Sequence, residues 1–160
     1  MKSTLIVGIG NILLGDEGVG VRAIERMQSM DLGEDLELLD GGTSGADLVE
    51  SLAGRDKVLV LDCVQFEASP GTVVRLRAED LAGEDRPVSI HQIGLVDSLL
   101  MTRRLGCAPR EVIVFGVVPA SLACSLKLTP AVEAALPKLI QAVLEEAGTM
   151  HQAPGRKNRH

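Results

Sequence analysis

Aromatic side chains are almost absent from this sequence, which has no Trp, no Tyr and only two Phe residues, Phe66 and Phe115. Without aromatic platforms on which bases can stack, binding of single-stranded nucleic acid is excluded as a main function. An excess of positive charge is missing too, because the formal net charge is −6, whereas phosphate backbones are bound by basic surfaces. We therefore expect no nucleic-acid partner and a core built from aliphatic side chains.

Long hydrophobic runs and paired cysteines are also lacking. No apolar stretch approaches the roughly 20 residues that span a bilayer, and the first residues, MKSTLIVGIGN, lack the long apolar region of a signal peptide. Cys63, Cys107 and Cys124 form no CxxC pair and cannot all pair with one another, which fits a reducing compartment. We expect a cytoplasmic protein with no membrane partner.

Aliphatic residues are abundant, because 46% of the 160 residues are apolar, enough for one domain with its own core. Apolar, β-branched runs alternate along the chain with segments of helical periodicity. The predicted strands are Thr4–Val7, Leu36–Leu39, Val58–Leu61, Thr72–Leu76 and Val112–Val117. The predicted helices run from about Gly18 to Met30, Ala46 to Ala53, Gln92 to Arg104 and Pro130 to Ala147.

This alternation of strands and helices predicts a doubly wound α/β domain. Most of the strands are apolar without alternation, as expected when both faces of a parallel sheet are covered. Thr72–Leu76 differs, because Val and Arg alternate in it and it follows a Pro-Gly turn; we expect an antiparallel edge strand there. Residues 1–147 are predicted to form a single domain, and the polar, basic residues 148–160 a disordered tail.

The glycine loop GNILLGDEGVG, residues 10–20, follows the first predicted strand. Such loops usually bind phosphate through free backbone N–H groups. Here Leu13 stands where a dinucleotide fingerprint has its third glycine, and Asp16 stands where a P-loop has its lysine. Because Asp16 and Glu17 would repel phosphates, the charge of the loop disfavours nucleotide binding.

Both acids also have purely structural interpretations. Asp16 precedes a predicted helix and is a favoured N-cap residue, and Glu17 in the first turn complements the helix dipole. Gly18 and Gly20 follow, where better helix formers would serve. Glycines at these positions indicate that the backbone of a partner or a bulky ligand comes close.

A second acid closes the predicted strand in KVLVLDCV, where Asp62 follows an apolar run. Ligands of open α/β sheets bind at the carboxyl ends of the strands, where the strand order reverses. If the order is 2-1-3, Glu17 and Asp62 share one crevice there; alternatively, Asp62 only caps the next loop. Cys63 lies beside Asp62, which would raise its pKa, and we expect it in the core.

His91 precedes an amphipathic segment and is the only histidine outside the tail. A solitary His near a helix start is often an ordinary surface or cap residue. Together with Glu17 and Asp62 it completes an O,O,N ligand set suited to a divalent metal such as zinc or nickel. Such a site keeps a coordination position open.

Over about residues 3–147, the sequence resembles the nickel–iron hydrogenase maturation proteases, with its motifs in the order that the family has them. The segments that carry the resemblance are GIGNILLGDEGVGVRAIE, LLDGGTSGADLV, VLVLDCV, PGTVVRL, HQIGLVDSL and VIVFGVVPASLACSLKLTPAVEAALP. The joint occurrence of GNxLxxDxGxG, DGGT, the strand-end Asp and HQ is specific, although no single one of them is.

The resemblance implies a three-layer sandwich around a twisted, mostly parallel five-stranded sheet. It also implies a cytoplasmic endopeptidase that removes a C-terminal extension from the hydrogenase large-subunit precursor after nickel insertion. The family's metal-binding positions correspond to Glu17, Asp62 and His91 here. Asp40, Gly41, Gly42 and Thr43, which begin the segment DGGTSG, could form a surface that the substrate tail crosses, or an ordinary turn at the strand end.

We expect the nickel to arrive bound to the substrate, so that the enzyme distinguishes metallated from unmetallated precursor. Cleavage then follows one of two schemes: the metal polarises the scissile carbonyl or acidifies a water, or the carboxylates act as an acid–base pair. Two other functions remain open at this point. One is a nickel-binding metallochaperone without peptidase activity, and the other is an NAD- or nucleotide-binding enzyme, favoured by Gly8, Gly10 and Asp40.

Overall fold

A computed structural model of the chain describes residues 3–43, 48–81, 88–89 and 92–148. Its parallel strands are β1 (Thr4–Ile9), β2 (Leu36–Gly42), β3 (Lys57–Gln65) and β6 (Glu111–Val117); β4 (Val73–Arg77) and the two-residue β5 (Val88–Ser89) are antiparallel to their neighbours. The helices are α1 (Val19–Met27), α2 (Val49–Leu52), α3 (Gln92–Arg104) and α4 (Pro130–Ala147), with 3-10 helices η1 (Gly15–Gly18) and η3 (Ala78–Leu81).

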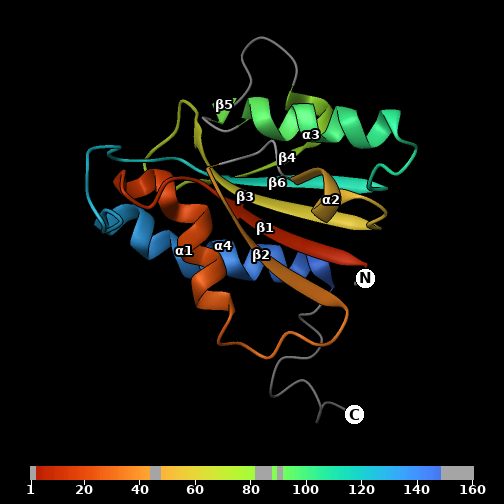
Figure 1. Ribbon diagram of the computed structural model, residues 1–160. Helices are drawn as coiled ribbons and strands as arrows, with labels where there is room; N and C mark the ends of the chain where they lie inside the picture. The colour runs from red at the N-terminus through yellow and green to blue at the C-terminus, as the bar shows by residue number, and fades with distance from the viewer. Residues whose placement is uncertain (1–2, 44–47, 82–87, 90–91, 149–160) are drawn as a thin grey trace.

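The strands lie in the order β2-β1-β3-β6-β4, with β5 paired to β3 alone. Figure 1 shows the sheet between two helical layers, α1 and α4 on one side and α2 and α3 on the other. The doubly wound three-layer fold predicted from the sequence is therefore confirmed. The antiparallel edge strand is confirmed too, since β4 pairs antiparallel with β6, and the strands have the 2-1-3 order that the shared crevice of Glu17 and Asp62 required.

The core is aliphatic and lies on both faces of the sheet. On the α1/α4 face, Leu59, Leu61 and Cys63 of β3 pack among side chains of both helices. On the other face, Val58 and Val60 of the same strand pack with Leu95 of α3. Because side chains of a strand alternate between faces, β3 reads as a continuous apolar run although each face receives only every second residue.

The element boundaries differ from the predicted ones in two instructive places. The first helix, predicted from about Gly18 to Met30, is α1 (Val19–Met27), which ends three residues earlier and is preceded by the 3-10 helix η1. The third strand does not end before Asp62, as predicted, but continues to Gln65. It continues because β6 pairs with Asp62 and Cys63, and β5 pairs with the last two residues of β3.

Candidate active site

Glu17 and Asp62 are brought to the same edge of the sheet. Glu17 lies in η1, directly after the loop that follows β1, and Asp62 lies one residue beyond Leu61, the last residue of β3 that pairs with β1. Both side chains are buried, with relative exposures of 6% for Glu17 and 0% for Asp62. Two carboxylates therefore sit at the carboxyl ends of neighbouring parallel strands, where ligands of doubly wound sheets bind.

Glycines allow the start of α1 to lie directly on these strand ends. A Cβ atom on Gly20 would lie 2.1 Å from the carbonyl oxygen of Leu61, and one on Gly10 would lie 2.1 Å from the carbonyl oxygen of Glu17. The close neighbour of Gly20 is thus the protein's own β3. A Cβ on Gly18 would likewise lie 2.7 Å from the Cα of Ile12. The protein's own backbone fills the space beside both glycines, so the prediction that Gly18 and Gly20 mark the approach of a partner or ligand is wrong.

Cys63 shows that three of the acids lie near one thiol. Burial first, and then the carboxylates of Asp62, Asp16 and Glu17, raise the pKa of this thiol to about 12. A thiol with such a pKa is protonated at neutral pH and is a poor nucleophile. Cys63 is fully buried in the core, as predicted, and the chemistry of the site rests on the carboxylates.

Asp62 has a defined orientation. Its Oδ1 accepts a hydrogen bond of 2.7 Å from the backbone N–H of Cys63. By the alternation of β3 its side chain lies on the face of Val58 and Val60, which is the face covered by α3. Helix α3 begins at Gln92, the residue directly after position 91.

Asp16 does not cap the helix that follows it. Neither η1 nor α1 has a side-chain capping hydrogen bond. Instead, the carboxylate of Asp16 accepts hydrogen bonds from the β6–α4 loop (residues 118–129), so the N-cap prediction is wrong. Sequence separations above 100 residues explain why no local pattern could reveal this contact. Sequence analysis missed the loop residues Ala120, Ser121 and Thr129 altogether.

The predicted substrate-binding segment begins at Asp40, and its described part lies beside the glycine loop. Gly10 donates a backbone hydrogen bond of 2.8 Å to the carbonyl of Gly42. The Asp40 side chain is exposed and accepts a bond of 2.9 Å from the N–H of Gly42, which is the strand-end turn considered above. Gly42 has φ +56°, Gly41 packs toward Val7 and Ile9, and Thr43 is exposed.

The third predicted ligand, His91, lies outside the described residues. Within the part of the chain that the structure describes, no three His, Cys, Asp or Glu side chains are grouped so as to hold a metal ion. Of the predicted O,O,N set, the structure describes only the two carboxylates, Glu17 and Asp62. Within the same part of the chain, no helix is long and apolar enough to cross a membrane.

The fold and the site together define a class of protein. This is a doubly wound α/β protein whose carboxyl edge carries buried acids on a glycine loop, an arrangement suited to a cation or to proton transfer rather than to a phosphate.

Comparison with known proteins gives the family. The family model for hydrogenase maturation proteases matches residues 21–146. Hydrogenase 2 maturation protease of Escherichia coli (strain K12) is 40% identical over 143 residues, covering 88% of this chain and 87% of that protein. The chain belongs to the hydrogenase maturation protease family and is a peptidase.

Solved structures agree. The hydrogenase maturating endopeptidase HybD from E. coli superposes with a TM-score of 0.82 at 37% identity, covering 92% of this chain and 94% of that one. A hydrogenase 2 maturation peptidase from Thaumarchaeota archaeon SCGC_AB-539-E09 gives a TM-score of 0.70 at 34% identity, covering 92% and 99%.

Proposed function

We propose that this endopeptidase recognises nickel carried by its substrate through Glu17, Asp62 and His91, and cuts the substrate only after the metal has been inserted. As a hydrogenase maturation protease, the chain processes the hydrogenase large subunit; the bond that it breaks releases a C-terminal extension. The observation that carries the proposal is the pair of buried carboxylates at the carboxyl ends of β1 and β3.

The donor chemistry supports nickel in the substrate rather than a resident metal. Two carboxylates and one imidazole form a modest ligand set, whereas proteins that carry nickel generally use richer sets of His or Cys. Such a set adds ligands to an ion that the precursor already holds, and its affinity for the free ion stays low.

Chain connectivity supports His91 as the third ligand. Ser89 of β5 pairs with Val64 of β3, two positions beyond Asp62. Ser89, the last described residue before His91, therefore lies beside the part of β3 that carries Asp62.

The described carboxylates can take part in peptide-bond cleavage in two ways. In one scheme they hold the substrate's nickel, which polarises the scissile carbonyl or acidifies a water. In the other, one group acts as a carboxylate and removes a proton from the attacking water, while the second acts as a carboxylic acid and gives its proton to the leaving amine, and nickel serves for recognition alone. A bell-shaped pH profile of kcat that loses one limb in Glu17→Gln supports the second scheme.

The segment Asp40–Thr43 is proposed to guide the substrate tail. β2 is an edge strand of the sheet, and an extended peptide can pair with the backbone of such a strand. Gly41 and Gly42 carry no side chain to obstruct it. We place the whole reaction in the cytoplasm, where the precursor is assembled.

The decisive experiment incubates the protein with nickel-loaded and nickel-free large-subunit precursor and measures the mass of any released peptide. We expect release of one C-terminal peptide from the loaded precursor only. Equal cleavage of both precursors contradicts nickel recognition. Stoichiometric nickel binding without cleavage points to a metallochaperone, and binding of labelled NAD or ATP points to the nucleotide-binding alternative.

A further inference from the structure

Asp16 is a fully buried acid whose carboxylate is saturated by one loop. Oδ2 accepts hydrogen bonds from the N–H groups of Ala120 at 2.8 Å and Ser121 at 3.1 Å and from the hydroxyl of Thr129 at 2.7 Å. Oδ1 accepts a bond from the N–H of Thr129 at 2.8 Å. Its relative exposure is 0%. Hydrogen bonds to a carboxylate are stronger than neutral ones, so this residue fixes the loop firmly.

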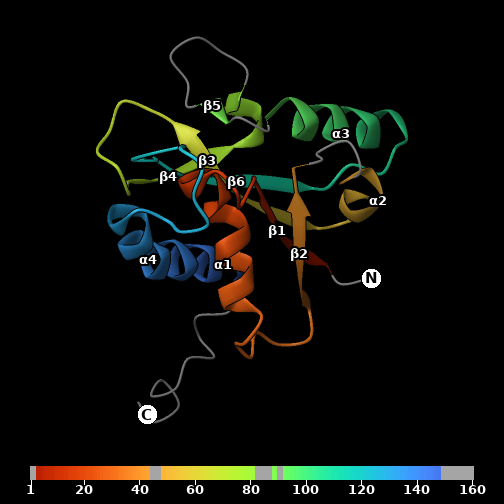
Figure 2. The same ribbon diagram turned by 60° about the vertical axis from the view of Figure 1, so that its left-hand side comes forward.

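These bonds hold the β6–α4 loop across the carboxyl end of β3. Asp16 follows β1 and Ala120 follows β6, and the two strands flank β3 on opposite sides. The bridged strands are about 10 Å apart. In the views of Figures 1 and 2, the blue-green loop between β6 and α4 lies beside the start of α1.

Backbone bonds connect the same two segments. Gly15 donates to the carbonyl of Ser125 at 2.9 Å, and Asp16 donates to the carbonyl of Ser121 at 3.3 Å. Ser125 donates in turn to the carbonyl of Leu13 at 3.0 Å. The 3-10 turn that carries Glu17 is therefore connected on its outer side to the β6–α4 loop through several bonds.

Thr129 contacts Asp16 instead of capping its own helix. It is the N-cap residue of α4, followed by Pro130, yet its side chain makes no capping hydrogen bond. A Thr in this position normally caps its own helix, a contribution of about 1 kcal/mol. Here the hydroxyl donates to Asp16 instead, so the long-range contact replaces the local one.

The loop lies on the side of the sheet that carries α1 and α4. Cys63, whose thiol is influenced by the charge of Asp16, packs on that face with Val117 and Val132. Asp62 belongs to the opposite face. The loop therefore lies over the α1/α4 side of the strand ends, whereas Asp62 lies on the α3 side.

We infer that Asp16 is a positioning residue for cleavage: by binding the β6–α4 loop, it holds the turn of Glu17 against β3 and directs the substrate to the α3 side of Asp62. The inference rests on the proposed function, because it assigns Asp16 a part in the reaction of Glu17 and Asp62. It makes Asp16 more than a source of stability.

The test compares variants by kcat per folded molecule with saturating nickel-loaded precursor. In Asp16→Asn the amide can still accept the three bonds at Oδ2, but its N–H groups then face the N–H of Thr129. Leu52→Ala is the matched control, because Leu52, the last residue of α2, is fully buried in the core on the other face. The folded fraction of each variant is measured by denaturant unfolding under assay conditions.

We expect Asp16→Asn to lower kcat per folded molecule at least tenfold and Leu52→Ala to leave it within twofold of wild type. Equal kcat values for the two variants overturn the inference. A wild-type protein that cuts neither precursor overturns the proposed function, and this inference with it.

A second pair of variants, at Thr129, tests the positioning role if Asp16→Asn does not fold. Thr129→Val removes the hydroxyl donor, whereas Thr129→Ser keeps it. We expect Thr129→Val to lower kcat per folded molecule severalfold and Thr129→Ser to match wild type. Indistinguishable kcat values for these two variants contradict the positioning role.

Discussion

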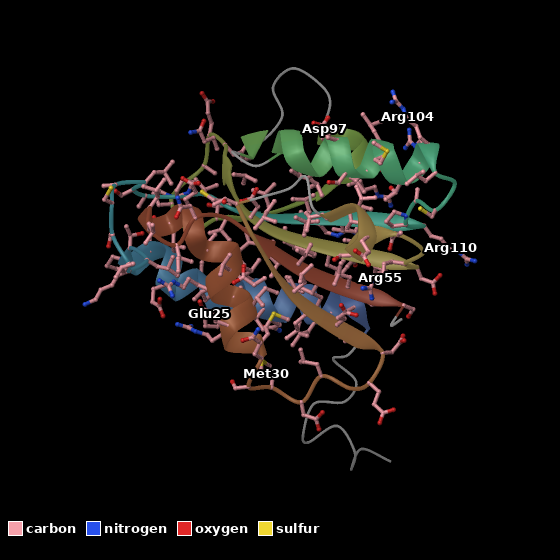
Figure 3. The ribbon with its side chains drawn as sticks, in the orientation of Figure 1. Glu25, Met30, Arg55, Asp97, Arg104 and Arg110 are labelled. Carbon is pink, nitrogen blue, oxygen red and sulfur yellow. The ribbon has the colours of Figure 1, made fainter. Side chains whose placement is uncertain are left out.

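The two ends of the sheet differ in how their charged side chains are arranged. At the amino ends of the strands, basic and acidic side chains form ion pairs: Arg55 with Glu37 at 3.1 Å, Lys57 with Glu111 at 3.4 Å and Arg110 with Asp56 at 3.5 Å. Figure 3 shows Arg55 and Arg110 at this end. At the carboxyl ends, three acids are buried close to one thiol.

The comparison separates charge used for the fold from charge available for chemistry. Ion pairs between exposed side chains contribute about 0–1 kcal/mol each and need only a partner of opposite sign. Buried acids of like sign oppose one another's ionisation, so grouping them has to be compensated. Asp16 is compensated by N–H and O–H donors of the β6–α4 loop, whereas Glu17 and Asp62 are the acids to which we assign the chemistry.

The largest effect is expected at Asp62. Asp62→Asn keeps an oxygen that can accept the N–H of Cys63 but removes the charge and the basicity. Cleavage of the nickel-loaded precursor should fall about a thousandfold, within the range for loss of an acid–base or charge-stabilising group. Thermal unfolding should stay within a few degrees of wild type. Ordinary cleavage by this variant contradicts both catalytic schemes.

Gly20 tests how the carboxyl edge is built. Gly20→Ala would place a Cβ 2.1 Å from the carbonyl oxygen of Leu61, so α1 has to move away from β3. We expect a loss of about 3 kcal/mol or more in the free energy of unfolding. Gly106→Ala is the control, since it has φ +75° but open space around the added atom and should cost about 1 kcal/mol. Similar losses for both variants contradict the close packing of α1 on the strand ends.

Arg55 tests the amino edge. Its side chain is only 4% exposed and donates to Glu37 and to the carbonyl of Ser51. Arg55→Met should cost about 1–3 kcal/mol of stability, read from urea unfolding. Cleavage per folded molecule should be unchanged because this edge takes no part in the reaction. A loss of kcat in this variant would contradict the conclusion that the amino edge serves only the stability of the fold.

The pH dependence that Cys63 adds to stability appears only in alkali. Its pKa is raised from 9.0 to about 12, so the folded protein keeps a proton that the unfolded chain releases above pH 9. Unfolding free energy should therefore fall as pH rises from about 9 toward 12, by up to about 1.4 kcal/mol per pH unit. Cys63→Ala should lose this part of the slope. An unchanged slope in Cys63→Ala would contradict the raised pKa that burial and the neighbouring acids give this thiol.

The sequence predicts what depends on short-range pattern. Apolar runs predicted the strands, and helical periodicity predicted α3 and α4 with their observed bounds. The 2-1-3 order then brought Glu17 and Asp62 to one edge, because sequential α/β units follow few topologies. Burial of Cys63 followed from its alternation with Asp62 along β3.

Long-range contacts explain the predictions that were wrong. Asp16 has the residue type and position of an N-cap, but its partners are in a loop more than 100 residues later, and nothing local indicates them. Gly20 has the pattern of a ligand contact, yet Leu61 of β3 occupies the space. The length of β3 beyond Asp62 depends on pairing with β5 and β6, which a single strand's sequence does not encode.

The most direct test of the account is a crystal structure of the protein with a divalent ion such as Ni²⁺ or Cd²⁺. The account predicts one ion in contact with carboxylate oxygens of both Glu17 and Asp62, with His91 as the nitrogen ligand. An ion bound elsewhere, or carboxylates too far apart to reach one atom, would contradict it.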